Sequence, residues 1–322
     1  MAQGRLKFPR RRFLPLAGAA LLDGCASPPQ PKEPPGTSAV FVAKASSYSR
    51  ELAAIVETGI KACGLSVRGK SILLKPNLVE FDSATTINTN VALLAAAVET
   101  FHKMGAAQVR VGEGPGHRRD TLFLASEADY RKGLDRFDHL FVDLNRDDIA
   151  PVPDFAGQPE FFFPKSALAA DLIVSMPKMK THHWTGATLS MKNFFGLVPG
   201  AVYGWPKNVL HQLGIANSIV ALHRVFRNTF AIVDGIVGME GNGPIQGSPK
   251  NAGVIVMGGD LPAVDATCCR IMGIDPSKLE YLQLARELGH IDSSRIEQRG
   301  ETIASVRTPF RLIEAFRNVR LA

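Results

Sequence analysis

Basic and polar side chains follow a short apolar segment in the middle of the chain. Residues 171–175 read DLIVS, which predicts a short buried strand, and Pro177 ends it. A lysine ammonium is a compact charge with three donors on a flexible stem, so several lysines that meet at the carboxyl end of a strand suit a phosphate or carboxylate ligand. The candidates in the loop-like sequence after the strand are Lys178, Lys180, His182, Lys192 and Asn193.

A solvated basic loop is the alternative interpretation of this segment. Trp184, Phe194 and Phe195 lie within the same stretch, and solvated loops seldom carry so much apolar surface. We therefore expect a binding site here rather than an exposed loop.

A second basic segment has the same arrangement. Residues 71–74 predict a buried strand, and Pro76 ends strand pairing just after it. Lys75 and Asn77 would then face a crevice at the end of that strand. We take both residues as candidates for binding a substrate.

A glycine-rich segment, GEGPGH at residues 112–117, follows the predicted strand at 107–111. Glycines such as Gly114 and Gly116 let backbone amides approach a ligand closely, as phosphate-binding loops do, although the spacing is not that of a dinucleotide fingerprint. A plain glycine turn is the alternative. Glu113 leaves open a role as metal ligand or general base.

Three acids are candidates for metal or proton chemistry. Asp234 follows the predicted strand at 229–233, Glu240 lies in the glycine-rich residues after it, and Asp265 lies one turn into a predicted helix. Together they could hold a divalent cation through oxygen ligands. Helix caps and turns are the alternative, and for Asp260 we favour an N-cap.

The elements that must position these residues alternate between strands and helices. The pattern predicts an α/β fold with a layered, mostly parallel sheet, helices on both faces and a crevice at the carboxyl ends of the strands. Strands are expected at 39–43, 71–74, 107–111, 139–144, 171–175, 229–233 and 254–257, and helices at 49–63, 90–104, 118–133, 208–226, 276–289 and 309–321, with an irregular excursion at 147–164.

The N-terminal residues predict export. Residues 9–22, PRRRFLPLAGAALL, resemble a twin-arginine export signal, and the apolar run is too short for a stable membrane-spanning helix. Residues 22–25 resemble a lipobox with Cys25 as the acylated residue, although Asp23 departs from the usual pattern. An uncleaved basic tail is the alternative. We expect an export signal at 1–24, a proline-rich tether at 25–38 and a single α/β domain at 39–322.

Charge and cysteine content exclude some classes of function. The net charge is +7, but much of the excess lies in the predicted signal, and no basic stripe with interleaved aromatics indicates nucleic acid binding. No C-x-x-C pattern for a metal site occurs. Contact with a membrane is expected only through the signal or a lipid on Cys25, which places the protein in the periplasm or on the outer face of a membrane.

Six motifs in one register resemble the bacterial and archaeal family called domain of unknown function 362, over about residues 70–300. They are KPNL at 75–78, GEGPG at 112–116, PKMKTH at 177–182, KNFFG at 192–196, VDGI at 233–236 and EGNGP at 240–244, followed by Asp265 and Ala266. The resemblance implies the fold better than a reaction. Some members carry ferredoxin-type cysteine clusters, but this chain lacks those cysteines, so no iron–sulfur cluster is expected.

Two functions remain open. In the first, the chain is an enzyme acting on a small anionic molecule: lysines bind the anion, His182 and Glu113 transfer protons, a divalent metal assists, or one lysine acts as nucleophile or base. In the second, it is a surface-tethered protein that binds an anion without transforming it. The expected catalytic residues are Lys178, Lys180, His182 and Glu113; the expected substrate-binding residues are Lys75, Asn77, Gly114, Gly116, Lys192 and Asn193; and the expected metal ligands are Asp234, Glu240 and Asp265.

Overall fold

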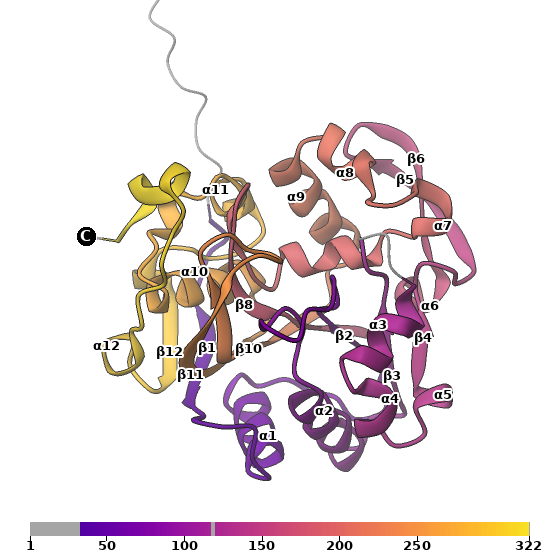
Figure 1. The fold of residues 1–322 in the computed structure, drawn as a ribbon, viewed down its shortest axis with the longest axis horizontal. Helices are drawn as coiled ribbons and strands as arrows, with labels where there is room; N and C mark the ends of the chain where they lie inside the picture. The colour runs from indigo at the N-terminus through magenta and orange to yellow at the C-terminus, as the bar shows by residue number, and fades with distance from the viewer. Residues whose placement is uncertain (1–32, 117–119, 322) are drawn as a thin grey trace, which may run out of the picture. The chain divides into compact units, whose positions relative to one another are not determined.

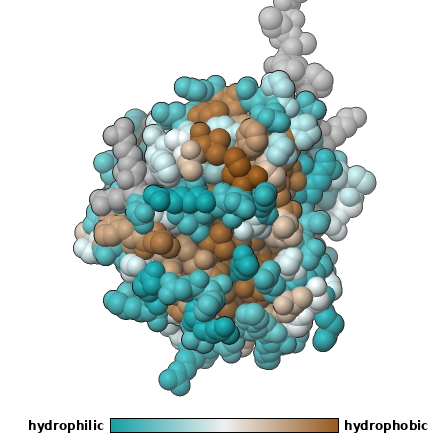
Figure 2. All heavy atoms as spheres, turned by 90° about the vertical axis from the view of Figure 1, so that its right-hand side faces the viewer, coloured by the Kyte–Doolittle hydropathy of each residue, from teal (hydrophilic) through white to brown (hydrophobic). Residues whose placement is uncertain are grey.

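The structure is a computed structural model that describes residues 33–116 and 120–321. The described residues form one compact unit. The predicted export signal, Cys25 and most of the predicted tether lie outside the described residues. None of the described helices combines the length and apolar character that a membrane crossing needs. Figure 2 shows hydrophilic and apolar residues mixed over the face that it presents.

The described residues form a large mixed sheet and a separate two-stranded sheet. The order across the large sheet is β12-β1-β11-β10-β7-β2-β3-β4, with β8 paired to β10 and β9 paired to β8. Neighbours from β10 to β4 are parallel, whereas β11 is antiparallel to both β10 and β1. The strands are β1 (Ser38–Lys44), β2 (Ser71–Pro76), β3 (Gln108–Glu113), β4 (Phe141–Asp143), β5 (Ile149–Phe155), β6 (Gln158–Pro164), β7 (Leu172–Met176), β8 (Lys178–His182), β9 (Gly186–Thr188), β10 (Thr229–Glu240), β11 (Ser248–Gly258) and β12 (Ile296–Gly300).

Helices surround the large sheet (Figure 1). The α-helices are α1 (Leu52–Ala62), α2 (Val91–Lys103), α3 (Thr121–Glu127), α4 (Tyr130–Gly133), α5 (Phe137–Leu140), α6 (Lys165–Leu168), α7 (Gly200–Tyr203), α8 (Asn208–Gln212), α9 (Ile215–Val225), α10 (Leu261–Ile271), α11 (Glu280–Leu284) and α12 (Ile303–Val306). The 3₁₀-helices are η1 (Lys192–Leu197), η2 (Pro276–Lys278), η3 (Ala285–Glu287), η4 (Ser293–Arg295) and η5 (Glu314–Val319).

Both faces of the central strands are buried, which explains their continuous apolar sequences. Ile72 and Leu74 of β2 belong to the hydrophobic cluster that contains α1 and α2, whereas Leu73 belongs to the cluster that contains α9 and α10. Alternate side chains of a strand point to opposite faces, so helices cover both sides of the sheet. The predicted α/β fold is confirmed.

The parallel strands deliver the candidate residues to one edge of the sheet. Lys75 lies at the end of β2, and Glu113 is the last residue of β3. Strand β7 ends at Met176, and Lys75 is in register with Ser175 across the β2–β7 pair.

Asp260 accepts a hydrogen bond from the backbone N–H of Ala263, which confirms the predicted N-cap of α10.

The excursion expected at residues 147–164 is a regular hairpin, so that prediction is wrong. Strands β5 and β6 pair antiparallel, and Ala156 and Gly157 both have positive φ in the tight turn between them. Alternation on β6 buries Phe161 and Phe163, while the prolines in β5 obscured the strand pattern in the sequence.

The loop expected after Pro177 is also a strand. Residues Lys178–His182 form β8, which pairs parallel with the far half of β10 and antiparallel with β9. Strand β10 runs on to Glu240, well past the predicted end at Val233. These pairings join distant parts of the chain, and local sequence patterns do not report them.

Several expected helices are shorter than predicted. The helix expected at 208–226 is divided into α8 and α9 because Gly214, with φ of +87°, ends the first. Within 118–133, the described residues form α3 and α4, separated at Asp129 with φ of 60°. The C-terminal segments expected as two surface helices are mostly short 3₁₀ turns, although Phe310 packs in the core as expected.

Candidate functional site

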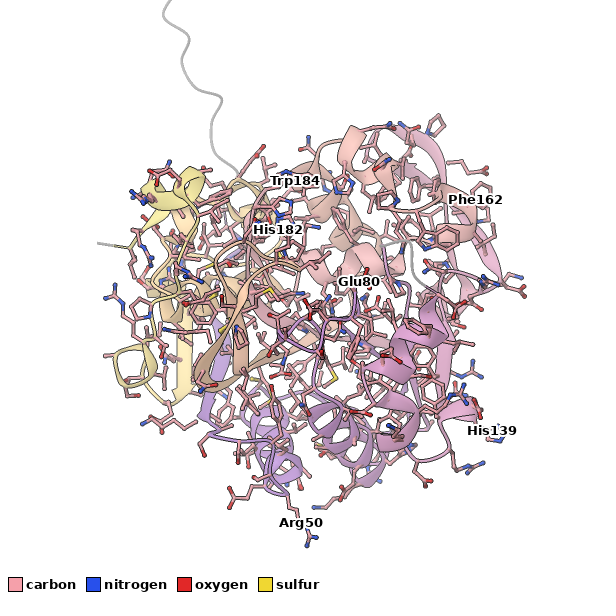
Figure 3. The ribbon with its side chains drawn as sticks, viewed as in Figure 1. Arg50, Glu80, His139, Phe162, His182 and Trp184 are labelled. Carbon is pink, nitrogen blue, oxygen red and sulfur yellow. The ribbon has the colours of Figure 1, made fainter. Side chains whose placement is uncertain are left out.

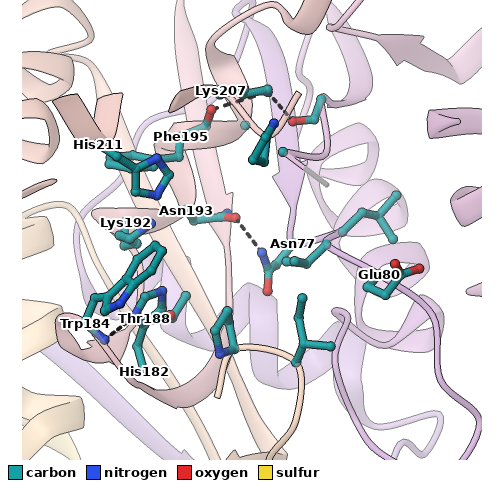
Figure 4. Close-up of a pocket in the computed structure, with 18 of the residues that line it drawn as sticks. Asn77, Glu80, His182, Trp184, Thr188, Lys192, Asn193, Phe195, Lys207 and His211 are labelled. Carbon is teal, nitrogen blue, oxygen red and sulfur yellow. Dashed lines mark hydrogen bonds between the residues drawn. The ribbon is translucent and has the colours of Figure 1, made fainter. Parts of the chain in front are cut away.

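A cavity of about 510 Å³ opens where the carboxyl ends of β2 and β3 meet the segments around β8, β9 and η1. Figure 4 shows one wall formed by Lys192, His182 and Trp184 and the opposite wall by Asn77 and Glu80. Its polar lining residues are Lys75, Asn77, Glu80, Glu113, His182, His183, Thr188, Lys192, Asn193, Lys207, Asn208, His211, Asn242 and Gln246, and both Gly114 and Gly116 also line it.

At the base of the cavity, Lys75 and Glu113 form a buried ion pair. The Lys75 Nζ lies 2.8 Å from both carboxylate oxygens of Glu113. Glu113 also accepts hydrogen bonds from the backbone N–H groups of Leu78 and Gly114. Burial lowers the pKa of Lys75, while the charge of Glu113 acts in the opposite direction. Both oxygens of Glu113 are therefore occupied, and the open general base expected from the sequence is not seen in this arrangement.

Two asparagines extend this network toward the cavity. The Asn193 Oδ1 accepts hydrogen bonds from Lys75 Nζ at 3.2 Å and from Asn77 Nδ2 at 3.3 Å. Its amide donates to the Lys75 backbone carbonyl and to Ser175 Oγ. The contact fixes the orientation of the Asn77 amide, as the dashed line in Figure 4 shows, and leaves Asn77 Oδ1 without a hydrogen-bond partner.

Lys192 and Lys207 line the cavity without a carboxylate partner in the described part of the chain. Lys207 is buried, and its Nζ donates to the backbone carbonyl of Gly114 at 2.6 Å. Lys192 keeps part of its surface exposed, and its Nζ lies 3.7 Å from the centre of the Phe195 ring. Burial lowers the pKa of each lysine to about 7.

Three histidines border the same space. The Nδ1 of His182 accepts a hydrogen bond from the backbone N–H of Trp184 at 3.0 Å, so the Nε2 of the neutral ring carries the proton. Burial first, and then the charge of Lys192, lower the pKa of His182 to about 2. The same two causes lower the pKa of His211. His183 donates from Nδ1 to the Gly243 carbonyl at 2.7 Å. Figure 3 places His182 and Trp184 beside each other in the fold.

Buried polar atoms that lack a protein partner gather at this cavity. Across residues 33–116 and 120–321, such side-chain atoms are Asn77 Oδ1, Thr188 Oγ1, His211 Nδ1 and Arg286 Nε. The first three belong to cavity-lining residues. A buried polar atom without a hydrogen bond costs about 1–3 kcal/mol of stability, so these three atoms could each gain a hydrogen bond from a polar ligand in the cavity.

Lys178, an expected catalytic residue, does not line the cavity. Its Nζ lies 2.6 Å from Asp234, and both side chains are fully buried. Tyr48 donates to Asp234 at 2.8 Å, and so does the backbone N–H of Asn90 at 2.9 Å. Burial lowers the pKa of Lys178, opposed by Asp234, and burial followed by Asp234 raises the pKa of Tyr48. This buried group ties β8 and β10 to the start of α2.

Lys180 does not line the cavity. Its Nζ donates to the backbone carbonyl of Ile87 at 3.0 Å and is 3.5 Å from that of Pro244, a lining residue. The described residues offer it no carboxylate. Burial, followed by the charges of Lys178 and Lys192, lowers the pKa of Lys180 to about 7.

The three acids expected to share a metal ion have separate partners. Asp265 accepts hydrogen bonds from Ser190 and Tyr281, and burial raises its pKa to about 7. Glu240 accepts from the backbone N–H of Arg311, and Asp234 belongs to the Lys178 group. No group of three or more His, Cys, Asp or Glu in the described residues is placed to hold a metal ion. Each of the three acids is thus used within the fold rather than in a shared group, and metal binding stays a prediction.

The sequence interpretation missed Lys207, His211 and Thr188. Lys207 follows Pro206 in a connecting segment, with φ of 63°, and has no neighbouring strand or glycine motif to mark it. His211 lies within α8, where a lone histidine is more often a packed or surface residue. Only the three-dimensional arrangement assigns these residues to the cavity.

Comparison with known proteins identifies the family. A model of the family described as domain of unknown function (DUF362) matches residues 72–270, which is more than half of the chain. The chain belongs to the DUF362 family. This confirms the resemblance seen in the motifs.

One relative of this DUF362 chain is the thylakoid-associated protein sll1697 of Synechocystis sp., which is 27% identical over 226 residues, covering 69% of this chain and 68% of that protein. The fold is similar to that of the lactate racemase apoprotein from Thermoanaerobacterium thermosaccharolyticum, with a TM-score of 0.47 and 13% identity. That match covers 74% of this chain and 57% of the racemase chain.

Proposed function

We propose that this DUF362 protein is an enzyme that acts on a small molecule bearing a phosphate or carboxylate group, bound in the cavity described above. The observation that carries the proposal is that Lys192 and Lys207 line the cavity without a carboxylate partner in the described residues. Lys180, 3.5 Å from the carbonyl of the lining residue Pro244, shares this lack of a carboxylate. We call these three residues the unpaired lysines.

Burying an ammonium group without an opposite charge is unfavourable, and a protein lowers that cost by releasing the proton. A bound anion would offset the cost instead and favour the charged form of each amine. Binding should therefore be coupled to proton uptake near pH 7, where the pKa values of Lys192 and Lys207 lie.

The neighbouring histidine supports catalysis rather than binding alone. With a pKa of about 2, His182 stays neutral at physiological pH, and its Nε2–H can donate to a substrate oxygen without carrying a charge. Amines with pKa values near 7 can both take and give a proton at that pH. The cavity thus combines a neutral donor with groups suited to acid–base chemistry.

Binding without turnover is the second candidate. Glu113 favours it, because both of its oxygens are held by Lys75 and two backbone N–H groups, which leaves the cavity without an open carboxylate base at that position. In that case the lysines would select an anion and the histidines would only orient it.

Calorimetric titration at pH 7 tests the anion site. The probes are inorganic phosphate and pyruvate, each measured in two buffers of different ionisation enthalpy, so that proton uptake is read directly. We expect binding with proton uptake, and Lys207→Met should weaken it by about 10-fold to 100-fold, since a charge-assisted hydrogen bond contributes roughly 1.5–3 kcal/mol. Lys132→Met is the matched control, because that lysine lies on the surface with a side chain 83% exposed. Equal losses in both variants, or no binding to any phosphate or carboxylate in a wider panel, would contradict the proposal.

Turnover separates the two candidates. Any anion that binds is incubated with the protein in deuterated water and followed by proton nuclear magnetic resonance. Loss of a carbon-bound proton signal or conversion of the compound, abolished in His182→Ala, indicates an enzyme. Tight binding without exchange or conversion across the whole bound set indicates a binding protein.

Metal content and export stay predictions. Elemental analysis of purified full-length protein tests for a divalent cation. Cell fractionation of the wild-type protein and of the double variant Arg10→Lys with Arg11→Lys tests export. Detergent phase partitioning of the Cys25→Ser variant tests the lipid anchor.

A further inference from the structure

Lys192 differs from the four buried lysines in and near the cavity. Lys75 and Lys178 pair with carboxylates, and Lys180 and Lys207 donate to backbone carbonyls at 3.0 and 2.6 Å. In the part of the chain that the structure describes, the Lys192 amine has neither an ion pair nor a hydrogen bond. Its contact is the face of the Phe195 ring, which attracts a cation but carries no charge to neutralise it.

Burial lowers the pKa of Lys192, and the basic groups that act on it offer no negative charge to oppose this effect. Lys180, His182 and His211 each interact electrostatically with Lys192, and none of them offers a negative charge. An amine that lines a cavity, is held by no donor–acceptor contact and is surrounded by basic groups keeps its lone pair available. Such an amine is a nucleophile toward a carbonyl carbon.

We propose that Lys192 forms an imine with a carbonyl group of the anionic ligand, so that the ligand class is a 2-oxo acid or a phosphorylated aldehyde or ketone. This inference rests on the proposed function, since the anion site brings the carbonyl to the amine. The Lys192 nitrogen attacks the carbonyl carbon, and the carbon–oxygen π electrons move to oxygen. That oxygen takes a proton while the nitrogen releases one of its two, which gives a neutral carbinolamine. Loss of the nitrogen-bound proton and departure of the hydroxyl as water give the imine, so an amine and a carbonyl yield an imine and water without oxidation.

The surrounding residues suit this step. The Nε2–H of His182 can donate to the carbonyl oxygen, because its Nδ1 is occupied by the Trp184 backbone N–H. Thr188 Oγ1 and His211 Nδ1 are buried without partners in the described residues and can exchange protons with the carbinolamine or its leaving water. Lys207, on the same cavity, remains available to hold the anionic group.

Pyridoxal 5′-phosphate is a suitable probe because it carries an aldehyde and a phosphate. The full-length protein is incubated with it at pH 7 and reduced with borohydride, and the modified peptide is mapped by mass spectrometry. At pH 7 a far larger fraction of Lys192 than of the exposed Lys132 is the free amine, and the weaker nucleophilicity of a less basic amine offsets only part of this difference. We therefore expect Lys192 to be labelled roughly 100-fold faster than Lys132. Labelling of Lys192 no faster than Lys132 would overturn the inference, and the wild-type protein alone decides this.

Two variants and a second probe separate the inference from the proposed function. Lys192→Met should lose the adduct, whereas Lys207→Met should keep it on Lys192 but need more probe; circular dichroism checks the fold of both. If the phosphate compound binds by calorimetry yet leaves no adduct on Lys192, the anion site stands and the imine is overturned. If pyridoxal without phosphate labels Lys192 equally well and no anion binds, the reactive amine stands and the anion site is overturned.

Discussion

The described lysines in and near the cavity fall into two electrostatic settings. Lys75 and Lys178 each lie within 2.8 Å of a carboxylate, and both pairs are almost fully shielded from solvent. The unpaired lysines Lys180, Lys192 and Lys207 gather around the cavity with backbone carbonyls or an aromatic ring as their contacts.

We propose that lysine serves two purposes in this part of the molecule. A buried pair with further hydrogen bonds fixes the positions of strands, as Lys178 and Asp234 do between β8 and β10. A buried amine without a carboxylate adds no such support and lowers stability unless a ligand compensates its charge. The presence of a partner carboxylate therefore separates structural lysines from candidate binding lysines here.

The most direct test of this comparison removes the carboxylate from the Lys178–Asp234 pair. Asp234→Asn leaves the Lys178 ammonium buried beside a neutral amide, and we expect a loss of about 3–5 kcal/mol in the free energy of unfolding. Urea unfolding at pH 7 measures it. The double variant Lys178→Met with Asp234→Asn should recover part of the loss, since no buried charge then lacks a partner. A single-variant loss below about 1 kcal/mol would place this pair in the same class as surface ion pairs.

A second test concerns the space around the Lys75–Glu113 pair. A Cβ on Gly196 would collide with Glu113 Oε1 and Lys75 Nζ, so Gly196→Ala should displace the pair and lower the free energy of unfolding by about 1–3 kcal/mol. Gly116→Ala is the matched control on the same cavity, because its nearest atoms are Pro206 O at 3.8 Å and Lys207 Cδ at 3.9 Å. Similar losses in the two variants would show that the pair is not rigidly held.

The fold could be predicted from the sequence because its central strands are buried on both faces. Apolar runs such as 71–74 and 171–175 predict strands with little ambiguity, and the helices around residues 52–62 and 91–103 have a clear apolar face. Pairing between distant segments was not predictable in this way. Residues 178–182 form a strand because β9 and the far half of β10 lie beside them.

The candidate site could be predicted only in part. Residues at strand ends, such as Lys75 and Glu113, line the cavity because chain direction brings the ends of parallel strands together. The sequence does not show which lysine pairs with a carboxylate. It therefore predicts both Lys178 and Lys192 as site residues, although Lys178 pairs with Asp234 and Lys192 contacts an aromatic ring. Lys207 comes from a connecting segment, where local pattern carries no information about the cavity.

The last test measures how an unpaired lysine changes the dependence of the unfolding free energy on pH. The pKa of Lys207 in the folded protein is about 7, below the value of about 10.4 for an exposed lysine, so unfolding takes up a proton between pH 7 and pH 10. Stability contributed by this group therefore rises with pH across that window, by at most about 1.4 kcal/mol per pH unit. Lys207→Met should remove that slope while keeping or raising stability at pH 7, and urea unfolding at pH 7, 8 and 9 with reductant present measures it. Tyrosine and cysteine titrations are common to both proteins, so the difference between the two curves isolates Lys207. A slope identical to that of the wild-type protein would mean that Lys207 keeps its proton throughout, and the two classes of lysine would then no longer differ in charge.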